Sequence, residues 1–207
     1  MKVVLASGNA GKQREFAALL APLGYEVVTQ TSLGIESVEE TGTTFEDNAL
    51  LKARHAARLS GLPALADDSG IEVDALGGRP GVYSARYAGP DATDEQNLRL
   101  MLHELDGVPE ARRGARYRCV LAFVRAADDP RPLLANGVWE GRILTAPRGV
   151  NGFGYDPVFQ PRGQSRDQPR SAAEMTAEAK NAVSHRAQAL VELVQLLGLL
   201  GAEPPLL

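Results

Sequence analysis

The chain has 207 residues, of which 44% are hydrophobic and 23% charged, and its formal net charge is −4. This length supports one large domain or two closely joined lobes, and it can bury enough apolar surface to fold without disulfides. The negative charge argues against a protein whose main task is to grip nucleic acid, and no apolar stretch approaches the roughly 20 residues of a membrane span.

The first part of the chain alternates predicted strands with a predicted helix. The N-terminal sequence MKVVLASGNAGK is too short and too soon interrupted to be a secretory signal, so we expect it to begin the fold. Residues 3–6 form a continuous apolar run, which is typical of a strand buried on both faces. Residues 25–29 predict a second strand. The helix between the two strands should bury Phe16, Leu19 and Leu20.

An exposed, acidic loop is expected over residues 31–43, and a helix should begin at Thr44 or Phe45 and end before Gly61. Residues 63–66 predict a short strand that leads into the polar sequence Asp-Asp-Ser-Gly at 67–70. The apolar stripe of the predicted helix consists of Ala49, Leu50, Ala53, Ala56 and Ala57.

A glycine-rich region follows as far as Gly89, and a capping-box pattern at residues 93–96 should open a helix that ends near Leu105. Residues 116–125 and 133–144 then predict two long strands that form a hairpin. The single cysteine, Cys119, lies in the apolar run CVLAFV, where we expect it to pack in the core. A lone cysteine cannot form an internal disulfide, which fits a reducing cytoplasm.

The last part of the chain predicts a rigid loop over residues 151–156, a short strand over 157–159 and a capping box at 171–174. The final helix should bury Ala187, Leu190, Val191, Val194 and Leu197, which follow helical spacing. The whole pattern predicts an α/β fold with a mixed, mostly buried sheet flanked by helices, in two lobes with an active-site cleft between them. No repeat or linker divides the chain, so we expect one domain over residues 1–207.

A first candidate for chemistry is the segment SGNAGK, between a buried strand and a helix N-terminus, where free backbone N–H groups favour an anion. Lys12 adds a full positive charge in the first turn. The glycine spacing does not match a Walker A loop, and Gln13 follows the lysine where that loop has Ser or Thr. Phosphate binding and an ordinary strand–helix turn capped by Asn9 remain equal alternatives.

A second candidate is the carboxylate pair Asp67 and Asp68, which follows a buried strand. Ligands bind at the carboxyl ends of strands in open α/β sheets, and oxygen ligands suit Mg²⁺, which takes one or two carboxylates plus substrate phosphates. The apolar run before the pair favours this interpretation over a solvated Asp turn. The acidic run at Glu39 and Glu40 is weak alone, but it could complete a magnesium site beside the Asp pair.

Two further segments could bind a flat ligand. In the sequence Gly-Phe-Gly-Tyr-Asp at 152–156, glycines on both sides of Phe153 allow close backbone approach, and the ring could stack on a base. A β-turn with core aromatics explains the same sequence equally well. Lys180, His185 and Arg186 could present donors to an anion or a base near the start of the last helix, although solvated helix-start residues are the commoner case.

No Ser–His–Asp or Cys–His arrangement competes convincingly with these candidates, and three histidines are too few for a typical histidine-rich metal site. The segments together resemble the inosine/xanthosine triphosphate pyrophosphatase family. The resemblance extends from the first predicted strand to the last helix, and its motifs are long and specific. They are LASGNAGK at 5–12, EETGTTFEDNALLKA at 39–53, ALADDSG at 64–70, LGGRPGVYSARYAG at 76–89, NGFGYDPVF at 151–159 and SHRAQAL at 184–190.

The resemblance implies a homodimer that hydrolyses ITP, dITP or XTP to the monophosphate and pyrophosphate with Mg²⁺. It implies that Asp68 is the catalytic carboxylate and a metal ligand, with Glu40 as its metal partner and Glu39 as the alternative. Ser69 resembles a substrate contact. The residues that would hold the triphosphate are Ser7, Gly8, Asn9, Ala10, Gly11 and Lys12, with Lys52 nearby. Those of the nucleotide pocket would be Phe153, Gly154, Tyr155, Asp156, Lys180, His185 and Arg186.

Two other functions remain open at this point. One is a related pyrophosphatase that acts on modified pyrimidines or ordinary triphosphates. The other is a module that senses nucleotides or binds RNA without turnover. Asp67, Asp68 and Glu40, together with three lysines, favour an enzyme over a binding module.

Overall fold

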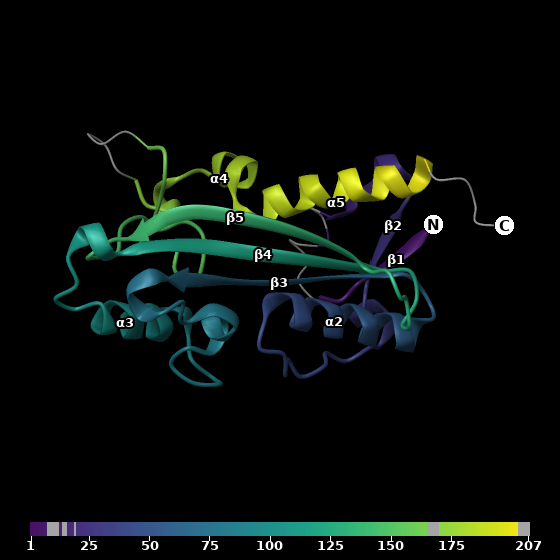
Figure 1. Cartoon of the computed structure of the whole chain (residues 1–207), viewed down its shortest axis with the longest axis horizontal. Coiled ribbons are helices and arrows are strands. Elements are labelled where there is room, and N and C mark those ends of the chain that lie inside the picture. Colours follow the sequence, from purple (N-terminus) through teal and green to yellow (C-terminus); the bar gives the residue numbers. More distant parts are fainter. Residues whose placement is uncertain (8–12, 14–15, 19, 165–169, 203–207) are drawn as a thin grey trace. The chain divides into compact units, whose positions relative to one another are not determined.

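The computed structural model describes residues 1–7, 13, 16–18, 20–164 and 170–202, and Figure 1 shows the arrangement of their helices and strands. The chain forms two compact units. Unit 1 consists of Met1–Asp68, Cys119–Gly137 and Gln188–Leu207, and unit 2 consists of Ser69–Arg118 and Val138–Ala187. Three strands, β3, β4 and β5, begin in one unit and end in the other, so each unit is assembled from segments that are distant in sequence.

Among the described residues, six strands form one mixed sheet in the order β2-β1-β3-β4-β5-β6. β1 pairs in parallel with β2, where Lys2 lies opposite Glu26, and with β3, where Val4 lies opposite Ala64. β5 and β6 are antiparallel. The predicted α/β class with a mixed sheet flanked by helices is therefore confirmed. The strands are β1 (Lys2–Leu5), β2 (Glu26–Thr29), β3 (Ala64–Val73), β4 (Gly114–Val124), β5 (Leu133–Ile143) and β6 (Phe159–Pro161).

Helix α2 (Phe45–Ser60) and helix α5 (His185–Ala202), which belongs to unit 1 from Gln188 onward, lie on opposite faces of the sheet (Figure 1). The predicted ends of α2 are confirmed, because the Thr44 side chain accepts a hydrogen bond from Asp47 N–H and Gly61 ends the helix with a φ of 69°. Small side chains let α2 pack close to the strands: Ala49, Ala53, Ala56 and Ala57 are all buried.

The core of unit 1 lies between α5 and the face of the sheet opposite to the one that α2 covers. Phe16 and Leu20 are buried there as predicted, Cys119 belongs to the same cluster, and predicted residue Leu19 lies outside the described residues. The predicted buried stripe of α5 is wrong at Val191, which is 59% exposed. Ala189 and Leu193 are buried beside the predicted Leu190 and Leu197, because apolar residues of this helix extend beyond the predicted stripe. The inward set is Ala189, Leu190, Leu193 and Leu197.

Unit 2 contains helix α3 (Asp94–Glu104), which opens with the predicted capping box between Thr93 and Gln96, and helix α4 (Ala177–Val183). The capping box at Ser171 is also present, but it opens a 3-10 turn, Ala172–Glu174, instead of an α-helix. The core of this unit joins the apolar side of α3 to the ends of the three long strands. Its large members include Ile71, Met101, Tyr117, Trp139 and Phe159.

Two predicted strand boundaries are wrong. The strand expected at residues 63–66 continues to Val73, so the sequence Asp-Asp-Ser-Gly is extended strand and not a turn. The apolar residues Ile71 and Val73 are fully buried beyond it, and their burial keeps the segment in the sheet. The strand expected at residues 157–159 begins instead at Phe159, because residues 153–158 form a turn that includes a hydrogen bond from Val158 N to Tyr155 O.

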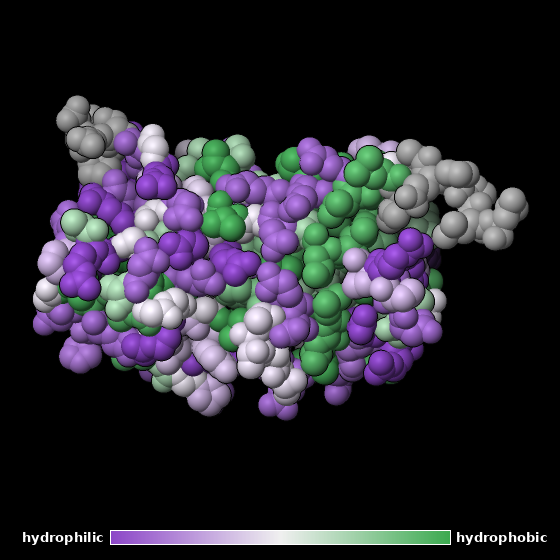
Figure 2. Space-filling model, in the orientation of Figure 1, coloured by the Kyte–Doolittle hydropathy of each residue, from purple (hydrophilic) through white to green (hydrophobic). Residues whose placement is uncertain are grey.

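On the face drawn in Figure 2, hydrophilic residues cover much of the surface, and hydrophobic residues form a band that runs from the C-terminal half of α5 down to the level of α2. Two apolar side chains of this helix, Val191 and Leu199, are well exposed. Within the described residues, no helix combines the length and the apolar character that crossing a membrane requires.

Candidate functional site

The Lys52 ammonium joins two carboxylates in unit 1. Its Nζ lies 2.7 Å from Glu40 Oε1 and 2.8 Å from Asp68 Oδ1. Lys52 comes from α2 and Asp68 from β3, whereas Glu40 comes from the loop before α2. The structure thus brings together three candidate residues from two motifs, since Glu40 and Lys52 share the motif at 39–53 and Asp68 belongs to the motif at 64–70. Of the two adjacent glutamates, Glu40 forms the contact with Lys52, whereas the Glu39 side chain is exposed.

Burial is the largest influence on both charged groups of this cluster. Desolvation raises the pKa of Asp68, and the nearby Lys52 ammonium only partly opposes that rise. Burial alone would lower the pKa of Lys52, but the charge and hydrogen bond of Asp68, followed by those of Glu40, outweigh it, so the net change is upward. Asp68 can therefore be protonated more readily than an exposed aspartate, while Lys52 stays positively charged.

Asn48 supports the same cluster, although the sequence reasoning missed it. It lies one helical turn before Lys52 on α2, is fully buried, and its Nδ2 donates to Asp68 Oδ2 at 3.4 Å. Its Oδ1 accepts from Gly42 N at 2.8 Å. A Cβ on Gly42 would meet Asn48 Oδ1 at 2.6 Å, so only glycine fits this approach. The i, i+4 spacing of Asn48 and Lys52 was the signal that could have identified it.

The donor set of this cluster is compatible with a hard divalent cation. Glu40 and Asp68 provide carboxylate oxygens that meet around a single position, now bonded to the Lys52 ammonium. Mg²⁺ commonly uses one or two protein carboxylates and takes its remaining ligands from water and phosphate. Within the described ranges, no group of three or more His, Cys, Asp or Glu side chains is placed to hold a metal on its own.

A pocket in unit 2 gathers eight of the residues that the sequence nominated. Ser69, Phe153, Gly154, Tyr155, Asp156, Lys180, His185 and Arg186 all line it. The other five lining residues were not among the candidates, although three of them lie inside motifs of the family resemblance, because nothing in the sequence indicated a role for them. These five are Gly70, Ser84, Ala85, Asp94 and Tyr117.

The loop that carries Phe153 is held by its own aspartate. Asp156 is 1% exposed, and its Oδ2 accepts from Phe153 N at 2.9 Å and from Lys180 Nζ. Gly152 has a φ of 79°, and a Cβ there would collide with the Asp156 carboxylate. The Lys180 ammonium also lies 4.7 Å from the centre of the Phe153 ring, a cation–π distance. The ring itself is 63% exposed and can receive a flat ligand.

The His185 side chain is stacked on an aromatic wall. The centre of its ring lies 4.8 Å from that of Tyr117, with only 10° between the two planes. Trp139 stacks in turn on Tyr117, with 6.4 Å between the ring centres. Tyr117 OH donates to Asp156 Oδ1 at 3.3 Å, which links this wall to the Phe153 loop. Burial raises the pKa of Tyr117, so its hydroxyl remains protonated. As predicted, His185 and Arg186 begin the last helix.

Ser84 connects the pocket wall to strand β3. Its Oγ accepts from Ile71 N at 2.8 Å and donates to Gly81 O, and its carbonyl accepts from Tyr155 OH at 2.8 Å. Ser69 differs from Ser84. Its buried Oγ has no hydrogen-bond partner within the part of the chain that the structure describes, although it lines the same pocket. A polar group of a ligand in the pocket could supply that missing bond.

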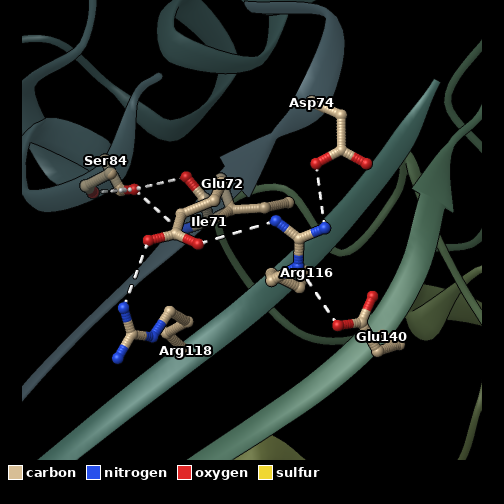
Figure 3. Close-up of polar contacts among 8 residues, drawn as sticks. Ile71, Glu72, Asp74, Ser84, Arg116, Arg118 and Glu140 are labelled. Carbon is tan, nitrogen blue, oxygen red and sulfur yellow. Dashed lines mark hydrogen bonds and ion pairs between the residues drawn. The ribbon is translucent and has the colours of Figure 1, made fainter. Parts of the chain in front are cut away.

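A second charged cluster of unit 2 spans strands β3, β4 and β5 (Figure 3). Arg116 bonds Asp74 at 2.8 Å and Glu140 at 3.1 Å and lies 3.8 Å from Glu72, which also contacts Arg118 at 3.5 Å. Each of these carboxylates is already paired with a guanidinium. We therefore interpret this cluster as a cross-strand contact that stabilises the sheet.

The predicted phosphate-binding segment is only partly visible. Ser7 is described and half-buried just after β1, where its N–H donates to Leu5 O. Gly8, Asn9, Ala10, Gly11 and Lys12 lie outside the described residues. The structure thus brings the other nominated residues into two groups, one in each unit: Glu40, Lys52 and Asp68 in unit 1, and the pocket in unit 2.

The fold and these two groups define an α/β protein with an aromatic-walled pocket in unit 2 and, in unit 1, a carboxylate–lysine cluster whose oxygen donors suit a divalent cation. The chain matches the Ham1 family over residues 3–196, and it belongs to that family.

Close relatives extend along almost the whole chain. Proteins named dITP/XTP pyrophosphatase are 57% identical in Yersinia pseudotuberculosis and 54% identical in Escherichia coli K12, each over 95% of this chain and 98% of the relative. The solved structure of a HAM1 protein from Coxiella burnetii is 46% identical, with a TM-score of 0.89 over 96% of this chain and 98% of that one. A nucleoside-triphosphatase, dITP/XTP pyrophosphatase, from Mycobacterium abscessus is 44% identical, with a TM-score of 0.79 over 95% of this chain and 100% of that one.

Proposed function

We propose that this protein hydrolyses non-standard purine nucleoside triphosphates, namely dITP, XTP and ITP, to the nucleoside monophosphate and pyrophosphate. The observation that carries the proposal is the unit 2 pocket, in a chain that is 54% and 57% identical to proteins named dITP/XTP pyrophosphatase. Such a reaction would remove these nucleotides from the cell's nucleotide pool.

The purine base would occupy the pocket and stack on Phe153. Stacking gives affinity to every base and therefore little selectivity. Selectivity would come from donors on the pocket wall, which Arg186 and His185 can supply. Hypoxanthine and xanthine carry an acceptor oxygen at position 6, whereas adenine carries an amino donor that would face another donor. An unpaired contact of this kind in a buried site costs a few kcal/mol.

The charged cluster of unit 1 would serve the triphosphate. We propose that Glu40 and Asp68 hold Mg²⁺, which suits their oxygen donors and, when bound, neutralises phosphate charge and makes a water molecule more acidic. Lys52 can release the carboxylates and turn its ammonium toward a phosphate, where it stabilises charge that develops on the leaving pyrophosphate. The segment from Ser7 to Lys12 would hold the remaining phosphate oxygens.

Asp68 would act as the general base of the reaction. Its carboxylate can accept a proton from a water molecule and orient that water for attack. Asn48 fixes the side chain through Oδ2. On the chain, Asp68 is followed directly by Ser69, whose buried hydroxyl lines the base pocket, so strand β3 carries both functions on consecutive residues. The oxygen of the attacking water becomes part of the monophosphate as the bond to the leaving pyrophosphate breaks, and no covalent enzyme intermediate is needed.

A substrate panel tests the proposal. Pyrophosphate release should be measured for ITP, dITP, XTP, GTP, ATP and dTTP at one magnesium concentration, and again after chelation of divalent cations. We expect kcat/KM to be highest for the first three nucleotides and activity to be lost on chelation. ATP or dTTP within a few-fold of ITP would instead favour a general pyrophosphatase. Tight binding of ITP without pyrophosphate release would favour a binding module.

We also propose that the active form is a cytoplasmic homodimer that needs no nucleic acid or membrane. The single cysteine and the net charge of −4 support the location and the absence of a nucleic-acid partner. Light scattering at micromolar concentration should give twice the chain mass of 22.1 kDa. A monomer under these conditions would refute the dimer without touching the proposed reaction.

A further inference from the structure

The two peptide groups on either side of Phe153 are both held by carboxylates. Phe153 N donates to Asp156 Oδ2 at 2.9 Å, and Gly154 N donates to Asp94 Oδ2 at 2.7 Å. The φ and ψ angles of Phe153 are the rotations between these two peptide planes. Two anchored planes therefore fix the direction in which the Phe153 side chain leaves the backbone.

Core packing does not supply that direction. The Phe153 ring is 63% exposed, and the ring contact that the structure gives it within the described ranges is the Lys180 ammonium at 4.7 Å. Gly154, which follows the ring, has a φ of 60° and no side chain to restrain it. An exposed aromatic ring on a glycine-flanked loop would otherwise sample many orientations, each with an entropic cost when a ligand selects one.

The two anchors differ in origin. Asp156 belongs to the same loop, so its bond to Phe153 N closes a local turn. Asp94 is the first residue of α3, directly after the Thr93 N-cap, and its helix starts with a complete capping box. The hydrogen bond from Gly154 N to Asp94 therefore ties the loop to a separate, rigid element. Asp94 also lines the pocket in which the ring lies.

We propose that Asp94 is a positioning residue for base binding, which acts through Gly154 N–H to set the orientation of the Phe153 ring. The inference rests on the proposed function, because it takes a purine as the occupant of the pocket. Asp94 would lower the entropic cost of stacking without touching the reacting phosphates. Its loss should therefore weaken nucleotide binding and leave the chemical step nearly unchanged.

Three single variants separate this role from others. In Asp94→Ala the acceptor is lost, and we expect KM for ITP to rise about tenfold while kcat stays within about twofold. In Asp94→Asn an amide oxygen can still accept from Gly154 N–H, so KM should stay within about threefold of wild type. The matched control is Glu95→Ala, which removes an adjacent acidic residue from the same helical turn, and it should behave like wild type. Thermal midpoints of all three verify that α3 remains folded.

A double-mutant cycle tests whether Asp94 acts through the ring. Calorimetry with inosine monophosphate should show weaker binding by both Asp94→Ala and Phe153→Ala, and the Asp94→Ala effect should vanish in the Phe153→Ala background. Additive effects, or Asp94→Asn as damaging as Asp94→Ala, would overturn the inference. A wild-type protein that neither binds inosine monophosphate nor cleaves ITP would instead refute the proposed function.

Discussion

The Asp68 carboxylate is 6% exposed and shares the Lys52 ammonium with Glu40, so a neutral replacement at this position leaves the lysine one ionic partner. An asparagine oxygen can also still accept from Lys52. The fold should therefore tolerate Asp68→Asn, whereas the proposed base and metal ligand are lost.

We expect Asp68→Asn to lower kcat for ITP by roughly a hundredfold or more, the range typical of a positioned general base. The measurement is pyrophosphate release under saturating ITP and magnesium, with the thermal midpoint as the check on folding. Asp47→Asn, an exposed change on α2, is the control and should retain wild-type turnover. Near-normal turnover and magnesium dependence in Asp68→Asn would remove this residue from the mechanism.

At the residue scale, sequence reasoning identified side chains with distinctive motifs and missed those that act through the fold. Phe153 and Asp156 share a motif, and both line the pocket. Asn48 and Ser84 lie inside motifs of the family resemblance and Asp94 inside a capping box, but none was a candidate because their importance lies in bonds to residues distant in the chain. No local pattern distinguishes a buried asparagine that orients a carboxylate from one that caps a turn.

At the element scale, a buried guanidinium holds the end of helix α3. Arg113 is 5% exposed and donates to the carbonyl oxygens of Leu105, Val108 and Leu144 at 2.6, 2.9 and 3.3 Å. Leu105 is the C-cap residue of α3, and Leu144 directly follows β5. One side chain thus joins the helix end to a strand end by three hydrogen bonds.

Replacing Arg113 by lysine should lower the free energy of unfolding by about 2–4 kcal/mol, because an ammonium cannot reproduce the fork of donors and leaves carbonyls unpaired. Chemical denaturation gives this quantity directly. The neighbouring Arg112→Lys is the matched control, since Arg112 is exposed, and it should change the free energy by less than about 0.5 kcal/mol. Equal stability of the two variants would contradict the structural role of Arg113.

Asp129, in the loop between β4 and β5, should make the stability of the fold depend on pH. Hydrogen bonds from the Arg125 side chain, and then those from the backbone N–H groups of Arg125 and Arg131, hold the pKa of Asp129 well below its usual range. Because the folded-state pKa lies below the unfolded value of about 3.9, the ionised group stabilises the fold above that value. This contribution is lost as the pH falls from about 4 toward the folded-state pKa.

Asp129→Asn should therefore lower the thermal midpoint near neutral pH, and its difference from wild type should shrink as the pH falls from about 5 to about 2. Thermal unfolding by circular dichroism over this range is the measurement. Asp128→Asn serves as the control, because Asp128 is exposed, and its midpoint should follow that of wild type. A difference for Asp129→Asn that stays constant with pH would contradict the assigned cause.

The elements themselves were largely predictable, and their ends depended on how clearly side chains signal them. Thr44 and Gly61 marked the two ends of α2 because caps have local chemistry. The end of β3 was misplaced by several residues, because Asp-Asp-Ser-Gly is a turn sequence by composition. Lys52 and Asn48 donate hydrogen bonds to the buried Asp68 carboxylate, which allows this residue to lie within the strand. Sequence alone does not reveal such contacts.

At the scale of the whole molecule, the class of fold followed from the order of apolar runs, but the division into units did not. Each unit is assembled from separate stretches of chain, and β3, β4 and β5 belong partly to both. We propose that the two units form one cooperative domain, because neither can unfold without breaking these three strands. Hydrophobic patterning is local and does not report where a strand passes from one unit to the other.

Thermal unfolding should accordingly show a single transition with equal calorimetric and van't Hoff enthalpies. The sharper test uses the only tryptophan, Trp139, which lies in unit 2. Leu193→Ala would create a cavity in the unit 1 core and should lower the free energy of unfolding by about 2–5 kcal/mol. If unfolding is cooperative, the unfolding midpoint detected by Trp139 fluorescence should fall accordingly. Val191→Ala, at an exposed position of the same helix, should leave it unchanged. An unshifted tryptophan signal in Leu193→Ala would show that the units unfold independently.

Because Cys119 is buried, a cysteine introduced on the surface could be labelled selectively. It is the only cysteine of the chain, it is 1% exposed, and thiol reagents need an accessible thiolate. A cysteine introduced at Val150, which is 96% exposed beside the Phe153 loop, would be the preferred site for a maleimide dye or spin label on the native protein. Such a probe could follow the loop as nucleotide binds, with the native sequence serving as its own unlabelled blank.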